Sequence, residues 1–149
     1  MTIKNIGKLL LLFTLSINYF AIAQNNEADA IIGTWLMPND EGIIEIFKEG
    51  EYYNGNIVWM LEKENDGTPL KDKENPVDSL KTRLVEGLQV MSAFKYKGNS
   101  LWSEGTFYAA KKGIEAEPDF ILIDKNKLNI KVSFLIFSMT IELTRVTPL

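Results

Sequence analysis

Short apolar runs separated by turn residues follow one another from Ile31 to the end of the chain, and this spacing limits the fold more than any other feature. Each run has the length of a β-strand, and hairpin-length links rich in Gly, Asn, Asp and Lys join most of them. Outside the first residues, no segment keeps a helical spacing of apolar residues for three turns. The sequence therefore predicts an all-β protein, an eight-stranded antiparallel up-and-down barrel, with strands at 31–37, 43–48, 52–61, 88–96, 101–110, 115–124, 127–134 and 137–146.

The third strand, 52–61, alternates most clearly, because its odd positions are mostly apolar and two of its even positions are Asn. A period of two places Tyr53, Ile57 and Trp59 on the inward face of the sheet. Residues 62–83 then interrupt the strands with charged residues, Gly and Pro, and are expected to form one long loop over the barrel. A short helix is expected within residues 77–86, as the loop returns to the next strand.

The first 23 residues have the pattern of a secretory signal peptide: Lys4 and Lys8, an apolar stretch, and the cleavage sequence Ala21-Ile22-Ala23. The alternative is an N-terminal membrane anchor, but polar Ser16 and Asn18 interrupt the run before it reaches the roughly 20 residues that span a bilayer. We expect cleavage, export to a periplasm or secretion, no stable membrane insertion afterwards, and a single domain over residues 24–149.

The chain contains no His and no Cys, and its net charge is −4. These absences exclude Ser-His-Asp and Cys-His catalysis, thiol chemistry and ordinary zinc sites. The acidic balance disfavours nucleic acid as a partner. Glu62, Glu64 and Asp66 resemble the start of a calcium loop, but Lys73 occupies the position that needs a bidentate Glu. We therefore expect no enzyme activity, no metal and no cofactor.

Aromatic residues lie on or beside almost every predicted strand, and a small barrel can use them in two ways. They can fill the interior as core, or they can line a cavity for an apolar ligand. If a cavity exists, Asn54, Asn56, Ser103 and Thr106 could supply polar groups. The residues expected to line it are Tyr53, Trp59, Trp102 and Phe107.

Residues 134–139 form the most apolar run after the N-terminal segment, at a junction between two predicted strands. The interpretation we favour is that both strands continue inward through this run. The alternatives are a hydrophobic lip at a cavity mouth and a contact with a partner.

The order of several motifs resembles the DUF2147 family, exported bacterial proteins of unknown function with a lipocalin-like barrel. The similarity extends over nearly all of residues 24–149, although the turn at residues 109–113 lacks the Asp-Pro that the family usually has, no proline follows Arg83, and residues 134–139 lack the usual glycines. The segments that carry the resemblance are residues 32–35, 53–59, 66–72, 75–76, 80, 83, 87–88, 102–108 and 143–146.

The resemblance implies how the barrel closes. In lipocalin-like barrels the tryptophan of a Gly-x-Trp motif plugs one end, and an arginine of the last strand lies over it. The corresponding residues here are Gly33, Trp35 and Arg145.

These observations predict a non-enzymatic periplasmic or envelope protein that binds a small apolar or amphipathic, lipid-like ligand. The alternative is a structural or protein-interaction module of the cell envelope with a filled barrel. Its function would then depend on residues 62–83 or residues 134–139.

Overall fold

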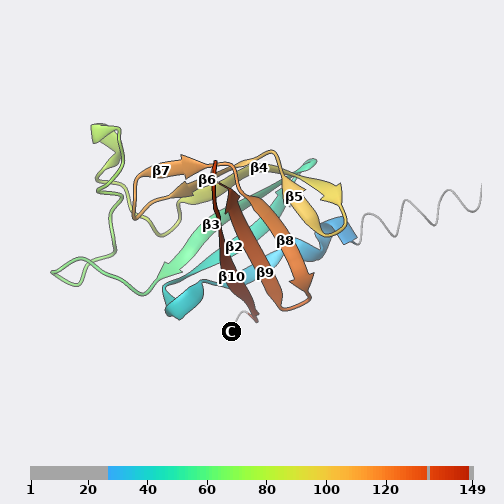
Figure 1. Ribbon diagram of the computed structural model, residues 1–149. Coiled ribbons are helices and arrows are strands. Elements are labelled where there is room, and N and C mark those ends of the chain that lie inside the picture. Colours follow the sequence, from blue (N-terminus) through green and yellow to red (C-terminus); the bar gives the residue numbers. More distant parts are fainter. Residues whose placement is uncertain (1–26, 134, 148–149) are drawn as a thin grey trace, which may run out of the picture. The chain divides into compact units, whose positions relative to one another are not determined.

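Eight antiparallel strands close into a barrel in the computed structural model, which describes residues 27–133 and 135–147 (Figure 1). Around the barrel the order is β3, β2, β1, β10, β9, β8, β5, β4, and pairing of β3 with β4 closes the ring. The predicted all-β, eight-stranded up-and-down barrel is confirmed. The elements are the 3₁₀ turns η1 (Asp29–Ile31), η2 (Pro38–Asp40) and η3 (Asp78–Leu80), and the strands β1 (Gly33–Leu36), β2 (Gly42–Glu49), β3 (Tyr52–Met60), β4 (Gln89–Gly98), β5 (Leu101–Ser103), β6 (Thr106–Ala109), β7 (Ile114–Ala116), β8 (Asp119–Asp124), β9 (Lys127–Ser133) and β10 (Ser138–Val146).

Residues 31–149 form one compact unit and residues 1–30 another, of which the structure describes only 27–30. The expected signal peptide, residues 1–23, lies outside the described residues, so export and the domain start near residue 24 stay predictions. None of the helical turns within the described range is long and apolar enough to cross a bilayer.

Two of the eight predicted strands are each broken in the middle, which explains why ten segments appear. Residues 101–110 divide into β5 and β6, and residues 115–124 divide into β7 and β8. Gly105 lies at the first break, where a Cβ atom would come within 2.5 Å of the Ser92 carbonyl oxygen and 2.4 Å of the Phe94 ring. Pro118 lies at the second break and has no N–H for the ladder. Glu104, next to Gly105, has a φ of 63°, which the backbone of a regular strand does not adopt. The first break therefore follows from the backbone at Glu104, and the second from Pro118.

Apolar side chains fill the barrel. The rings of Phe94 and Phe120 meet edge to face with centroids 4.9 Å apart, and those of Tyr53 and Trp102 do so at 6.1 Å. Trp35, Phe94, Trp102 and Phe120 expose no surface at all. A side chain beside a cavity large enough for water would expose area to it, so these residues are packed core.

A β-bulge in β3 overturns the prediction that Trp59 points inward. Ile44 pairs with Ile57 while the adjacent Ile43 pairs with Trp59, so Val58 is an extra residue in the ladder. The extra residue reverses the alternation of inward and outward positions. As a result Met60 is buried at 2% exposure, whereas Trp59 is exposed at 38%.

The long segment between β3 and β4 is ordered by local pairings and not by the expected helix. Within residues 77–86 the structure contains only the single 3₁₀ turn η3, so the predicted short helix is wrong in extent. Two isolated antiparallel bridges, Lys63 with Pro69 and Lys71 with Leu84, fold the segment back on itself. Val85, at 1% exposure, anchors its returning arm in the core.

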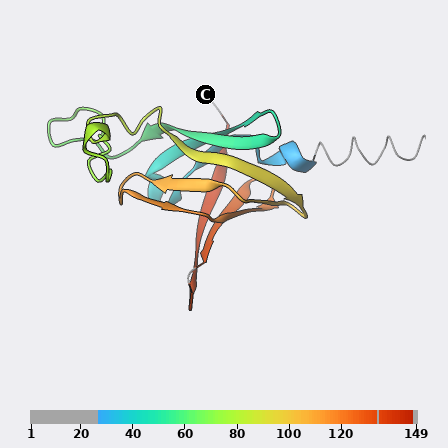
Figure 2. The same cartoon turned by 90° about the horizontal axis from the view of Figure 1, so that it is seen from above.

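The β9–β10 hairpin extends beyond the strands that flank it, as Figure 2 shows for the orange and red ribbon that projects below the barrel. The pairing of β8 with β9 ends at Lys131, and the pairing of β1 with β10 involves only Thr144 to Val146, yet β9 and β10 pair as far as Ser133 and Ser138. Phe134 lies outside the described residues. The favoured interpretation of residues 134–139 is wrong, because Leu135, Ile136, Phe137 and Met139 are exposed.

Candidate functional site

Asp72 is the most deeply buried charged residue described, with 0% exposure, and it organises the long loop. Arg83 donates to its Oδ2 atom from Nε and Nη2, each at 2.8 Å. Asn75 donates to the same oxygen at 2.8 Å, and the Tyr108 hydroxyl donates to Oδ1 at 2.7 Å. Four donors around one carboxylate offset the cost of removing it from water.

Three of these residues, Asp72, Asn75 and Arg83, belong to the long loop, and Tyr108 comes from β6. The Asp72 N–H donates to the Arg83 carbonyl at 3.0 Å, so the two arms of the loop lie side by side. Tyr108 reaches the carboxylate from β6, and its ring lies 5.6 Å from the Arg83 guanidinium carbon. The resulting Asp72 cluster (Asp72, Asn75, Arg83 and Tyr108) ties the loop to the barrel wall.

The hydrogen bonds of the cluster also affect the titration of Tyr108. Burial, followed by the hydrogen bond to Asp72, raises the pKa of Tyr108 above its ordinary value. Tyr108 therefore keeps its proton at neutral pH and acts as a hydrogen-bond donor to Asp72. Across the described residues, no group of three or more acidic side chains gathers in a way that could hold a metal ion.

A hollow of about 470 Å³ opens beside this cluster, between the loop and strands β4, β6 and β7. Its volume lies within the range of small-molecule sites. Its lining is mixed. The apolar residues are Pro76, Val77, Leu80 and Val90, and the others are Asn75, Arg83, Gln89, Ser92, Thr106, Tyr108, Gly113 and Glu115.

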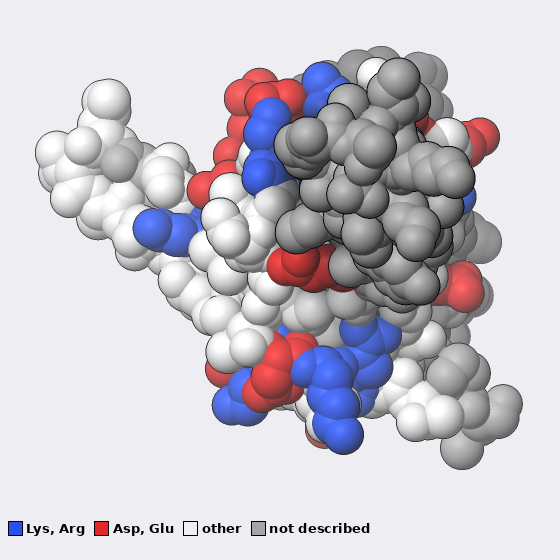
Figure 3. Space-filling view, turned by 90° about the vertical axis from the view of Figure 1, so that its right-hand side faces the viewer, with Lys and Arg blue, Asp and Glu red and all other residues white. Residues whose placement is uncertain are grey.

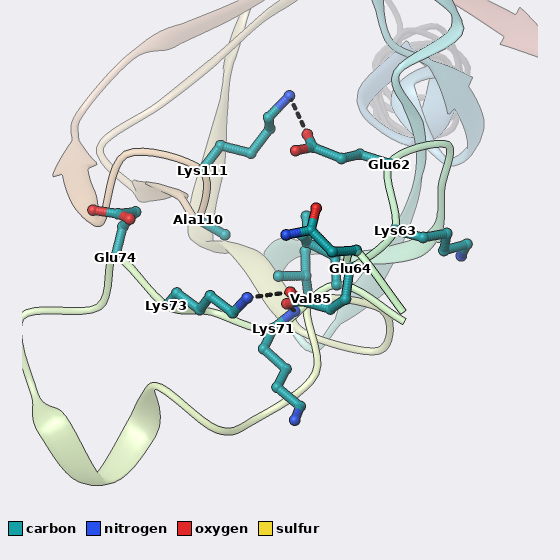
Figure 4. A pocket seen from close by; sticks show the side chains of 11 residues that line it. Glu62, Lys63, Glu64, Lys71, Lys73, Glu74, Val85, Ala110 and Lys111 are labelled. Atoms are coloured by element: carbon teal, nitrogen blue, oxygen red, sulfur yellow. Dashed lines mark hydrogen bonds and ion pairs between the residues drawn. The ribbon is translucent and has the colours of Figure 1, made fainter. Parts of the chain in front are cut away.

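A second hollow, of about 260 Å³, is lined by charge pairs that join residues of the loop to one another and to Lys111 (Figure 4). Lys73 pairs with Glu64, and Lys111 lies 2.8 Å from Glu62. The hydrogen bond from Lys73 lowers the pKa of Glu64, and the contact with Glu62 raises that of Lys111. These ion pairs hold the loop in place. Because their charges neutralise each other, the hollow presents little net charge to a ligand.

The four residues expected to line an interior cavity do not do so. Tyr53 and Trp102 are core residues with 2% and 0% exposure, and Trp59 faces outward because of the bulge. Phe107 is half-buried and packs against Phe120, with ring centroids 5.9 Å apart. Among the polar residues suggested with them, Thr106 lines the larger hollow, whereas Asn54 accepts a hydrogen bond from the Ala93 N–H at 2.8 Å.

The structure brings Gly33, Trp35 and Arg145 together at the seam between the first and last strands. The Arg145 guanidinium carbon lies 4.1 Å from the centroid of the Trp35 ring, and these two residues pair in register. Arg145 also donates to the Ile32 carbonyl at 2.7 Å and to the Lys125 carbonyl at 2.6 Å. A Cβ atom on Gly33 would lie 2.5 Å from Nη1 of Arg145, so the position accepts only glycine without rearrangement.

The comparisons with known proteins agree with this architecture. The family model described as "Uncharacterized protein conserved in bacteria (DUF2147)" matches residues 33–145. The chain belongs to the DUF2147 family. This DUF2147 chain is also similar in structure to a Helicobacter pylori protein, described as "Protein HP1028 from the human pathogen Helicobacter pylori belongs to the lipocalin family". The TM-score is 0.67 at 18% identity, over 78% of this chain and 83% of that one, which shows a shared fold. No curated protein sequence matches the chain.

The Asp72 cluster was not predicted from the sequence. All four residues belong to the segments that carry the resemblance to DUF2147 proteins, but they were not assigned a site. The signal that could have found them is a carboxylate, an amide, an arginine and a tyrosine, spread over several of those matching segments without any periodic apolar role. Polar residues of this kind that are not part of the apolar core are candidates for contact with one another in the folded chain.

Proposed function

We propose that this DUF2147 protein is a non-enzymatic binding protein for a small amphipathic molecule, held in the 470 Å³ hollow beside the Asp72 cluster. The observation that carries the proposal is the mixed lining of that hollow, which includes the apolar side chains of Val77, Leu80 and Val90 and the polar side chains of Arg83 and Tyr108. An apolar group would be buried against the first set, and a polar or anionic head would meet the second.

Arg83 is the positively charged residue among those that line the hollow. A guanidinium carries five N–H donors, and Asp72 accepts from those on Nε and Nη2. The Arg83 side chain is 35% exposed, so part of it faces the solvent at the hollow. Because Asp72 and Tyr108 hold it in place, little conformational entropy would be lost when a ligand binds.

The proposed ligand site differs from the interior cavity expected from the sequence, since the aromatic core leaves Tyr53 and Trp102 no free surface. The filled interior also supports a second candidate, an envelope protein that works by contacting other molecules through its surface. For either candidate we propose the compartment that the N-terminal pattern predicts, outside the cytoplasm.

The test is native mass spectrometry of the mature protein purified from its host. We expect a ligand adduct on the wild-type protein that is lost in Ser92→Trp, because the indole would occupy space in the hollow that the ligand needs. The matched control is Ser103→Trp, a half-buried serine on β5 that does not line the hollow. The control should keep the adduct.

Two results would contradict the proposal. One is a wild-type protein that carries no adduct and is not stabilised against melting by any member of a panel of amphipathic molecules. The other is an adduct that survives in Ser92→Trp while Ser103→Trp removes it.

A further inference from the structure

The projecting end of the β9–β10 hairpin is an apolar surface that neither the barrel nor the proposed ligand site explains. Leu135 and Ile136 are 105% and 93% exposed, and Phe137 and Met139 are 61% and 42% exposed. Exposed apolar residues are ordinary when they are scattered, but a contiguous group at a protruding tip marks an interaction site. These four residues are called the hairpin tip below.

The hairpin tip and the strand ends that lead to it contain no charged residue. Residues 132–141 contain no Asp, Glu, Lys or Arg, and the first charged residue toward the barrel on β9 is Lys131. Figure 3 shows the hairpin as an arm at the left, with white, uncharged atoms toward its end. The tip and the strand ends next to it therefore carry no charge.

The geometry of the tip fits hydrocarbon better than a protein partner. It is the narrow end of a two-stranded ribbon, and its four side chains expose on the order of 500 Å² of surface. A stable protein interface needs about 800 Å² from each partner, with matched shape. Lipid acyl chains accommodate a convex apolar tip without a matching shape, and a lysine at the base can extend its ammonium group to the headgroups.

We infer that the hairpin tip inserts into the surface of a lipid bilayer and docks the barrel there reversibly. Leu135 and Ile136 enter the acyl boundary, and Lys131 lies at the level of the headgroups. Because the contact is apolar, it needs no anionic lipid and is insensitive to salt. This inference is independent of the proposed ligand site.

Vesicle flotation of the mature chain tests it, with vesicles of phosphatidylcholine alone and with added phosphatidylglycerol. We expect wild-type protein to float with both, and Leu135→Asp/Ile136→Asp to lose at least tenfold in partition coefficient. The control is Ile123→Asp, which alters an exposed isoleucine (54%) on β8, away from the tip, and should float like the wild type. Melting curves of all variants establish that each is folded.

A second variant locates the insertion directly. Ile136→Trp should show a blue-shifted emission with vesicles and quenching by lipids brominated in the acyl chains, beyond the signal of the three native tryptophans. Absence of flotation by wild-type protein, or equal flotation by the double variant, overturns the inference. A wild-type dimer that the double variant abolishes, without vesicle binding, would assign the tip to self-association and also overturn it.

Discussion

At the residue scale, the stability of the loop depends on Asp72, whose carboxylate is completely buried. A buried ion pair adds little relative to an apolar pair of the same shape, but losing one partner leaves an unpaired buried charge. The four donors around Asp72 therefore act as a unit, and each is more costly to remove than a surface contact. Surface pairs such as Lys81 with Asp78 contribute far less.

Arg83→Ala should lower the free energy of unfolding by about 3 kcal/mol, because it strands the Asp72 carboxylate. The matched control is Lys81→Ala, which breaks an exposed pair and should change stability by less than about 0.5 kcal/mol. Urea unfolding measures both. Adding Asp72→Asn to Arg83→Ala should restore part of the lost stability, since the unpaired buried charge is removed. Equal losses of stability in Arg83→Ala and Lys81→Ala would contradict the role of the cluster.

Tyr108 should titrate above the ordinary phenol value near 10, because burial and the hydrogen bond to Asp72 raise its pKa. The folded protein then holds this proton to higher pH than the unfolded chain. The resulting stability is fully present below pH 10 and is lost as the pH rises through the folded pKa. Ultraviolet titration of wild type minus Tyr108→Phe gives the curve of this one phenol. A midpoint at or below the ordinary value would refute the assignment.

At the element scale, the strands were predictable and their exceptions were not. Strand positions follow from period-two alternation and turn residues, both of which are local in the sequence. Trp59 was misplaced because the bulge at Val58 arises from pairing between β2 and β3, which no local pattern encodes. The projecting hairpin likewise depends on where β1 and β8 stop pairing with β10 and β9.

The site was less predictable than the fold for the same reason. Asp72 and Tyr108 are 36 positions apart, and their hydrogen bond exists only because the loop folds back over β6. Loop residues are placed by tertiary hydrogen bonds, so composition alone indicated a loop and nothing about its contacts. By contrast, the positions of Gly33, Trp35 and Arg145 came from the family resemblance, and the structure places them side by side.

At the scale of the whole molecule, the seam between β1 and β10 holds the barrel closed through three residue pairs. Arg145 reinforces that seam from the last strand through its ring contact with Trp35 and its two backbone carbonyls. Burial lowers the pKa of its guanidinium, but arginine stays charged throughout the physiological range. The seam is therefore insensitive to pH in that range.

Arg145→Ala should lower the free energy of unfolding by about 2–3 kcal/mol, through loss of the cation–π contact and two hydrogen bonds. The melting temperature should fall by roughly 10 °C. Gly33→Ala should also destabilise, because its Cβ atom conflicts with Nη1 of Arg145. The double variant should lose less than the sum, since the conflict disappears with the guanidinium. Strict additivity, or an Arg145→Ala melting curve equal to the wild type, would contradict the seam's role.

The seam also has a consequence for the order of events in folding. The hydrogen bond from Arg145 to Ile32 joins residues 113 positions apart, so the entropy cost of closing almost the whole chain precedes any gain from this contact. Hairpins between neighbouring strands can form early, whereas we expect ring closure to come late and to limit the rate. A chain that emerges amino-terminus first from a ribosome cannot complete this barrel until β10 is free to pair with β1.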